Sequence, residues 1–185
     1  MKKIEILCKN NWVSLLKMIY PEKGCNGYIY SHETRCDGHI VSILPYRIND
    51  NKLEIMLRKE VTPCWDINNQ VISSITGGWE KDKHLTPLFT AVEEIHEEAG
   101  YIVNASDIIE LGTIFGIKSS DTIYHLYTVD LTNKEQGEAI GDGSELEAQA
   151  SCYWTTSIKD AKDPFVFTMF YKLMKLLNVE FKYKG

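Results

Sequence analysis

The spacing of apolar residues changes once along the chain, near Thr86, and this change restricts the fold more than any other feature of the sequence. Before it, apolar and polar residues alternate, as in β-strands, within 4–7, 12–20, 27–31, 39–48 and 53–59. After it, apolar residues recur every three or four positions, as on one face of a helix: Leu88, Ala91, Val92, Ile95 and Ala99. The sequence therefore predicts a strand-rich beginning followed by a helix that packs on a sheet.

The expected helix, 87–99, has clear ends. Thr86 is a suitable N-cap, and Pro87 suits the first helical position because its fixed φ is helical and its missing N–H has no helical acceptor. Gly100 suits the left-handed residue that ends many helices. Further strands and a final amphipathic helix are expected at 108–117, 122–131, 150–155 and 164–177, with a polar loop at 133–147. This order predicts an α/β fold in which helices pack on a mixed β-sheet.

Composition narrows the class of protein. A length of 185 residues, with 44% hydrophobic and 25% charged residues, fits one folded domain with a small appendage. The net charge of −6 disfavours nucleic acid or an anionic membrane as the main partner. Because there is no apolar block of a signal peptide and no run of about 18 apolar residues, we expect a cytoplasmic protein. The five cysteines, without a Cys-x-x-Cys pair, are expected to be reduced and mostly buried.

The second face of the helix 87–99 is acidic. Glu94, Glu97 and Glu98 lie three or four residues apart, with Glu93 beside them. Each like-charge pair at this spacing costs roughly 0.2–0.5 kcal/mol, and acidic groups in the last turn oppose the helix dipole. Such a face is either a solvated acidic surface or a set of oxygen ligands for a hard divalent cation. The surrounding sequence favours the cation.

The segment 77–102, GGWEKDKHLTPLFTAVEEIHEEAGYI, resembles the Nudix box, which consists of a Gly-rich loop, a helix and a Gly-capped turn. Its second half matches the family pattern in register, with Tyr101 at the final aliphatic place: Glu94, Ile95, Glu97, Glu98 and Gly100. Upstream, Gly77 and Gly78 match the pattern only if one residue is inserted. The metal-binding glutamates of the family are therefore all present.

Two positions depart from the family pattern. Glu93 stands where the family has Arg, and the first family Glu falls at Leu85, unless a shift brings Glu80 or Asp82 into its role. In the family this Arg and Glu chiefly brace the loop against the helix. Their joint replacement is therefore expected to remove one structural pair without leaving a single unpaired charge.

The amino-terminal flank, 12–47, resembles the ADP-ribose pyrophosphatase branch of the Nudix family. This resemblance implies a Nudix-like α/β/α sandwich with a mixed β-sheet, formed by the hydrolase domain 37–185. It also implies an N-terminal β-hairpin extension, 1–36. If this extension is used as in its relatives, it exchanges between two subunits and the protein is a homodimer.

The same resemblance implies a metal site and a set of catalytic residues. Mg²⁺, with Mn²⁺ as an alternative ion, would be held by Glu94, Glu97 and Glu98. Glu97 and Glu98 are therefore also catalytic candidates. In the late loop, Glu145 and Glu147 are candidates for a base or a further ligand, and the alternative is a solvated acidic loop.

Four residues are candidates for binding the substrate. The backbone amides of Gly77 and Gly78 can approach a phosphate closely because no side chain intervenes. Arg35 and Arg58 can bind phosphate oxygens in a bidentate manner, or instead make ion pairs. The expected substrate is a nucleoside diphosphate linked to another group, such as ADP-ribose or a nucleotide sugar, cleaved by water at the pyrophosphate. A catalytically weak nucleotide-binding or sensor module is one alternative, and a hydrolase of nucleoside triphosphates or dinucleotide polyphosphates is another.

Overall fold

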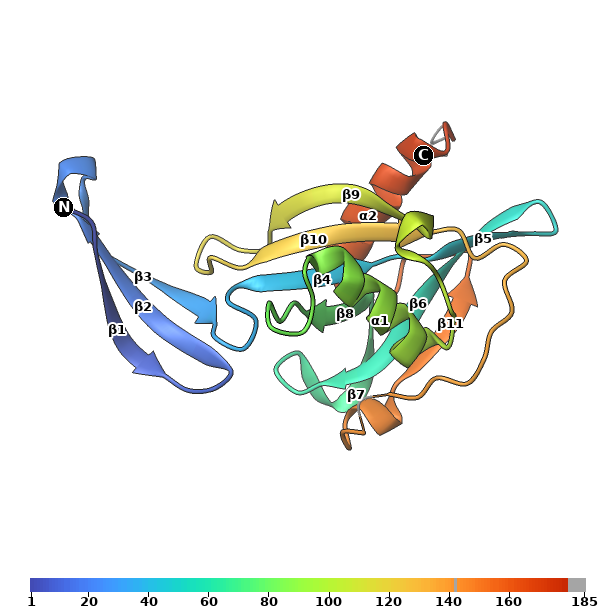
Figure 1. Ribbon diagram of the computed structural model, residues 1–185, viewed down its shortest axis with the longest axis horizontal. Coiled ribbons are helices and arrows are strands. Elements are labelled where there is room, and N and C mark those ends of the chain that lie inside the picture. Colours follow the sequence, from blue (N-terminus) through green and yellow to red (C-terminus); the bar gives the residue numbers. More distant parts are fainter. Residues whose placement is uncertain (142, 180–185) are drawn as a thin grey trace.

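The computed structural model describes residues 1–141 and 143–179 (Figure 1). The strands in this part of the chain are β1 (Lys3–Lys9), β2 (Val13–Tyr20), β3 (Cys25–Glu33), β4 (His39–Ile43), β5 (Tyr46–Asn49), β6 (Lys52–Thr62), β7 (Asp66–Ser73), β8 (Ile75–Gly78), β9 (Ile108–Phe115), β10 (Ile123–Val129) and β11 (Ser151–Thr155). The helices are α1 (Pro87–Ala99) and α2 (Pro164–Leu176), with 3₁₀ turns η1 (Pro21–Lys23), η2 (Ala105–Asp107) and η3 (Glu147–Gln149). The helix predicted at 87–99 is confirmed as α1.

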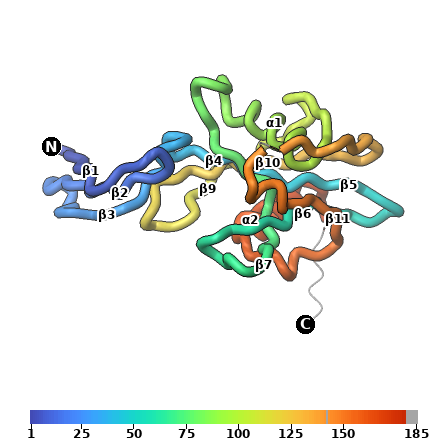
Figure 2. The backbone as a smooth tube through the Cα atoms, turned by 90° about the horizontal axis from the view of Figure 1, so that it is seen from below, coloured from blue at the N-terminus to red at the C-terminus, as the bar shows by residue number. Residues whose placement is uncertain are grey.

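Two β-sheets lie between the two helices. One has the strand order β8-β4-β10-β9, in which β4 and β10 are parallel and the other neighbours are antiparallel. The other has the order β11-β6-β5, with β7 paired to β6. Figure 2 shows α1 on one side of these strands and α2 on the other. The predicted α/β/α sandwich with a mixed β-sheet is therefore confirmed.

A hydrophobic cluster under each helix holds the layers together. Ile55 and Leu57 of β6 point into the cluster beneath α2, and Met56 between them points into the cluster beneath α1. This alternation follows because successive side chains of a strand face opposite sides of the sheet. Each helix contributes apolar residues to its own cluster, such as Ile95 from α1 and Met169 from α2. The packing fixes the angle at which α1 presents its acidic face.

Local sequence determines both ends of α1. Pro87 is its first residue and Thr86 its N-cap, although the Thr86 side chain makes no capping hydrogen bond. Gly100 ends the helix with a φ of 73°, which is the left-handed conformation expected for it. A Cβ at Gly100 would lie 2.5 Å from the carbonyl oxygen of Gly137, whose own N–H donates to the Gly100 carbonyl (2.8 Å). Gly100 therefore also lets the late polar loop pack against the end of the helix.

The first three strands form a separate antiparallel sheet with the order β1-β2-β3, which extends away from the sandwich (Figure 1). It has three strands, where the sequence suggested a hairpin. Main-chain hydrogen bonds join it to the sandwich at Ser31, whose N–H donates to Ser119 and whose carbonyl accepts from Asp121. Most residues of β1 are exposed, and most residues of β2 and β3 are half-buried.

Some strand predictions differ from the structure. The segment 39–48, expected to be one strand, is divided into β4 and β5 near Pro45, which has no N–H to donate to a ladder. β7 and β8 were not expected. The first half of β7, Asp66 to Gln70, is polar and largely exposed, so it lacks the alternation that marks a half-buried strand.

The cysteines are free, as expected, but the prediction that most are buried is wrong. Cys8 and Cys64 are exposed because the first lies on the projecting sheet and the second in the turn between β6 and β7. Cys36 is buried, and the other two are half-buried. Among the described residues, no helix is long and apolar enough to cross a membrane.

Candidate active site

A cavity of ≈ 220 Å³ opens beside the carboxy-terminal half of α1. Glu97 and Glu98 line it from the helix, Arg58 lines it from β6, and Glu147 lines it from η3. Most of the remaining wall is formed by small and apolar residues of the loop that precedes β11. The structure thus brings three of the predicted carboxylates and one predicted arginine to a single cavity.

Glu94 packs against Gly77 at the end of β8. A Cβ on Gly77 would lie 1.7 Å from Oε1 of Glu94, so only glycine leaves room for this carboxylate. Burial, together with the negative charge of Glu97, raises the pKa of Glu94 to about 8. The structure shows that Gly77 makes room for Glu94, a predicted metal ligand, and the approach of a phosphate to Gly77 stays a prediction.

Glu98 forms a buried ion pair with Arg58. Their side chains are 7% and 6% exposed, and Nη1 of Arg58 contacts Oε2 of Glu98. Burial raises the pKa of Glu98 well above its usual value, although the charge of Arg58 acts in the opposite direction. Loss of one member of such a pair leaves an uncompensated buried charge, which typically costs about 3–5 kcal/mol.

The guanidinium of Arg58 contacts two further carboxylates. Its Nε lies 3.2 Å from Oε2 of Glu60, and its Nη2 lies 3.4 Å from Oε1 of Glu147. The hydroxyl of Ser73 donates to Oε1 of Glu60 (2.7 Å). Arg58 therefore makes the ion pairs that were weighed against phosphate binding, and its contact with a substrate stays a prediction.

The late loop brings Glu147 rather than Glu145 to the cavity. Glu145 is exposed, and its carbonyl accepts a hydrogen bond from the side chain of Gln149 (3.0 Å). The loop is held to α1 by its main chain, since the N–H of Gly141 donates to the carbonyl of Glu97 (3.0 Å). The geometry favours Glu147 over Glu145 as the candidate base, and the role itself stays a prediction.

Arg35 lies beside the second glycine of the pair. A Cβ at Gly78 would lie 2.9 Å from Nη2 of Arg35, and the guanidinium carbon lies 5.3 Å from the centre of the Trp12 ring. Glu94 lies on the Cβ side of Gly77 and Arg35 on that of Gly78, so the two side chains are at the same end of β8 but on opposite faces of it. Arg35 is exposed, so its guanidinium is accessible to an anion from solvent.

Glu93, which replaces the family arginine, has basic partners of its own. Its Oε1 lies 2.9 Å from Nζ of Lys83, and its Oε2 lies 2.8 Å from Nε2 of His84. Burial alone would raise the pKa of Glu93, but the hydrogen bonds from His84 and Lys83 hold it below its usual value. The expectation that this brace is lost is therefore wrong. The pair is present with its charges exchanged: the acid is on the helix and the base is on the loop.

The position of this partner could have been found in the sequence. Counting back from the helix places the family glutamate at Leu85, but Leu85 is 86% exposed. Counting forward from Gly78 reaches His84 after the same five intervening residues that the family pattern has. The inserted residue therefore falls after His84, and it is this histidine, rather than Glu80 or Asp82, that faces Glu93.

The glutamates of α1 offer carboxylate oxygens, which suit a hard cation, but their side chains are not arranged around one common point. Within residues 1–141 and 143–179, no group of three or more His, Cys, Asp or Glu side chains is arranged to hold a metal ion. Other contacts hold two of these side chains apart: Glu98 forms an ion pair with Arg58, and Glu94 packs against Gly77.

Comparison with solved structures identifies the fold. No family model matches the chain, and no curated protein matches its sequence. A structure described as an ADP compounds hydrolase has a TM-score of 0.66 at 13% identity, covering 96% of this chain and 94% of that one. The NUDIX domain of Shewanella oneidensis NrtR, complexed with ADP ribose, has a TM-score of 0.57 at 12% identity, covering 75% of this chain and 87% of that one. The chain therefore has a Nudix-like fold, as its sequence predicted.

Proposed function

We propose that this protein is a Mg²⁺-dependent Nudix pyrophosphohydrolase that cleaves a nucleoside diphosphate linked to another group, of the ADP-ribose or nucleotide-sugar type. The observation that carries the proposal is the group of crowded carboxylates beside the cavity, where burial and mutual repulsion raise the pKa values of Glu94 and Glu98. Crowded acids of this kind are typical of functional sites. The two similar structures, one an ADP compounds hydrolase and one bound to ADP ribose, support the substrate class.

The donor set fits a hard divalent cation. Mg²⁺ prefers oxygen ligands, and a cation would offset the burial and the repulsion from Glu97 that together raise the pKa of Glu94. Glu94, Glu97 and Glu98 would hold it, with Mn²⁺ as an alternative ion. Bound there, the ion would supply neutralisation of the pyrophosphate charge and a lower pKa for a coordinated water.

The remaining roles belong to residues of the chain itself. Glu147 faces the cavity and is our candidate for the base that takes a proton from the attacking water, with Glu145 as the less favoured candidate. Arg35, exposed beside Gly78, is our candidate for binding a phosphate oxygen. In this proposal the Gly77–Gly78 backbone forms part of the wall that the pyrophosphate approaches.

The proposal is tested by removing one carboxylate charge at a time. Glu97→Gln and Glu98→Gln are each expected to lower turnover at least ~100-fold, because a carboxylate charge proposed to hold the metal ion is lost. Glu98→Gln also removes the buried partner of Arg58, so its melting temperature is measured beside its turnover. Glu110→Gln, which changes an exposed glutamate of β9, is the matched control. Far-ultraviolet circular dichroism of each variant checks that it is folded. Near-normal turnover in both site variants would refute the assignment.

One observation favours a second candidate function. Arg58 already neutralises Glu98, so the site could bind a nucleotide without completing a metal centre. A nucleotide-binding or sensor module of this kind would show ADP-ribose affinity by calorimetry but no Mg²⁺-dependent product. Nucleoside triphosphates and dinucleotide polyphosphates would be the substrates of a third candidate, a hydrolase with the same machinery.

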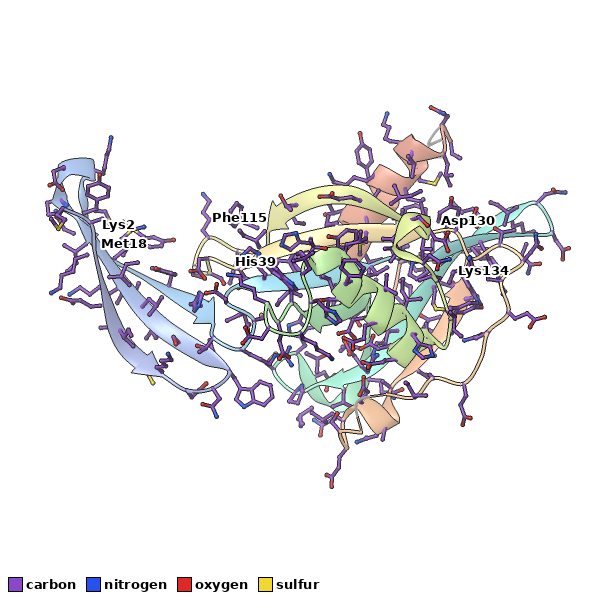
Figure 3. All side chains as sticks on the ribbon, viewed as in Figure 1. Lys2, Met18, His39, Phe115, Asp130 and Lys134 are labelled. Atoms are coloured by element: carbon purple, nitrogen blue, oxygen red, sulfur yellow. The ribbon has the colours of Figure 1, made fainter. Side chains whose placement is uncertain are left out.

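We also propose that residues 1–36 are a dimerising extension of the hydrolase domain 37–185. Apolar side chains gather on one face of the projecting sheet, because register places Ile4, Met18 and Tyr28 opposite one another on adjacent strands. Ile4 is 47% and Tyr28 is 50% exposed, and Figure 3 shows Met18 in the same part of this sheet. A second copy would remove this surface from water. A monomer at micromolar concentration by light scattering would contradict the proposal.

A further inference from the structure

Arg58 is enclosed on every edge of its guanidinium. Nε faces Glu60 of its own strand, Nη1 faces Glu98 of α1, and Nη2 faces Glu147 of η3. The side chain is 6% exposed. Three carboxylates from three different elements therefore converge on one cation, and little of that cation is open to a ligand.

Glu60 is the fixed end of this network. It lies two residues after Arg58 on β6, so both side chains are on the same face of the strand. Its second oxygen accepts a hydrogen bond from Ser73, which lies directly opposite Arg58 in the ladder between β6 and β7. Nε of Arg58 makes no hydrogen bond among the described residues, so Glu60 acts on it as a negative charge 3.2 Å away. Because a guanidinium is planar, a charge that attracts its Nε edge also favours one direction for the other two edges.

The other end of the network is the turn that carries Glu147. This residue belongs to the short turn η3, and residues 139–141, 143 and 144 before it line the cavity. Its contact with Arg58, at 3.4 Å, is the longest of the three. Arg58 is thus a link between the carboxylate of Glu147 at the cavity and Glu60 on the sheet.

We propose that Glu60 and Arg58 are positioning residues: Glu60, held by Ser73, orients Arg58, and Arg58 holds the carboxylates of Glu98 and Glu147 at the cavity. The inference rests on the proposed function for what those two carboxylates do. Glu60 does not line the cavity, so it acts through Arg58 and not on a substrate. Arg58 is accordingly assigned a structural task inside the site rather than phosphate binding.

The test uses Glu60→Gln, which keeps the size of the side chain and removes its charge. We expect faster amide hydrogen exchange in residues 143–150 of the metal-free, substrate-free protein, because the tie between loop and sheet loosens. With Mg²⁺ and ADP-ribose, we expect kcat to fall roughly 10-fold while KM stays within about twofold, since correct geometry and not binding is lost. Arg58→Lys is expected to behave in the same way, because an ammonium cannot present three fixed edges.

The matched control is Glu54→Gln. Glu54 lies on the same strand, and its carboxylate is paired at 2.7 Å with Arg47 and not with Arg58. It should change neither the loop exchange nor kcat. The inference would be overturned if Glu60→Gln changed neither the amide exchange of residues 143–150 nor kcat. A rise in KM alone for Arg58→Lys would also overturn it, because that result would mean that Arg58 binds the substrate. If the wild-type protein cleaves no substrate, the proposed function fails, while the exchange experiment still decides whether Glu60 and Arg58 position the loop.

Discussion

The exchanged brace between α1 and its preceding loop allows a stringent test, because its charges can be reversed to the order that the family has. Glu93→Arg places a cation beside Lys83 and His84 and removes the acceptor that both side chains now use. His84→Glu in the same chain supplies a new acceptor for that arginine. Trp79 holds the main chain here in either case, since its indole N–H donates to the carbonyl of His84 (3.0 Å).

The contacts give the size of the effect. The hydrogen bond between Glu93 and His84 is largely shielded, with side chains 25% and 20% exposed, and a bond to a charged group contributes about 1.5 kcal/mol. Lys83 is 53% exposed, so solvent screening leaves its pair with Glu93 only about 0.5 kcal/mol. Losing both gives a destabilisation of about 2 kcal/mol for Glu93→Arg, which corresponds to a melting temperature roughly 4–8 °C lower for a chain of this size.

Urea unfolding of the wild type, both single variants and the double variant completes a double-mutant cycle. We expect the double variant to recover at least half of the loss, with a coupling energy of about 1 kcal/mol or more. Glu135→Arg, at an exposed position, makes the same change of net charge and is the control. If the two single effects simply add, His84 and Glu93 do not interact and the brace does not exist.

Two other predictions concern Gly77, which contacts Glu94, and the paired histidines of β4 and β10, His39 and His125. Gly77→Ala should displace the carboxylate of Glu94, because the new Cβ would lie 1.7 Å from Oε1 of Glu94. Since this flexible side chain can move away, we expect little change in melting temperature. Turnover should fall at least ~10-fold, because the carboxylate would leave its position at the site. Nδ1 of His39 lies 2.9 Å from Nε2 of His125, and burial lowers the pKa of each histidine. The unfolded chain therefore binds more protons than the folded one below a pH of about 6.5, so stability should fall as pH drops from 6.5 towards the folded-state pKa values. His39→Gln should flatten this dependence in melting curves recorded across that range, and an unchanged slope would contradict the reasoning.

The elements that the sequence predicted are those whose signals are local. α1 was found with both ends correct because Pro87, Gly100 and its apolar spacing all lie within one short segment. β4 and β6 of the sandwich were found because each contains a short apolar run and polar turn residues lie between β5 and β6, which is also local information. β7 was missed because its first half is mostly polar and exposed, so its pairing with β6 and not its own pattern explains it.

The site was predicted in its carboxylates but not in their arrangement. Glu94, Glu97 and Glu98 were identified from helical spacing and from the resemblance. The contacts of Arg58 depend on strand pairing and on loop closure, which join residues as far apart as Arg58 and Glu147, and spacing along the chain carries no information on such pairs. Glu60 was missed for this reason, although its place two residues after Arg58 on a strand is a usable signal.

Phosphate release from ADP-ribose, nucleotide sugars, dinucleotides and triphosphates, each with and without Mg²⁺ and with a coupled phosphatase, tests the central claim most directly. We expect Mg²⁺-dependent cleavage of a diphosphate-linked compound, with ADP-ribose or a nucleotide sugar cleaved in preference to triphosphates, and no cleavage when EDTA removes the ion. Cleavage that is equally fast in EDTA would contradict the assigned role of the carboxylates. Silence across the whole set, with ADP-ribose still bound in calorimetry, would mean that the fold serves recognition and not hydrolysis.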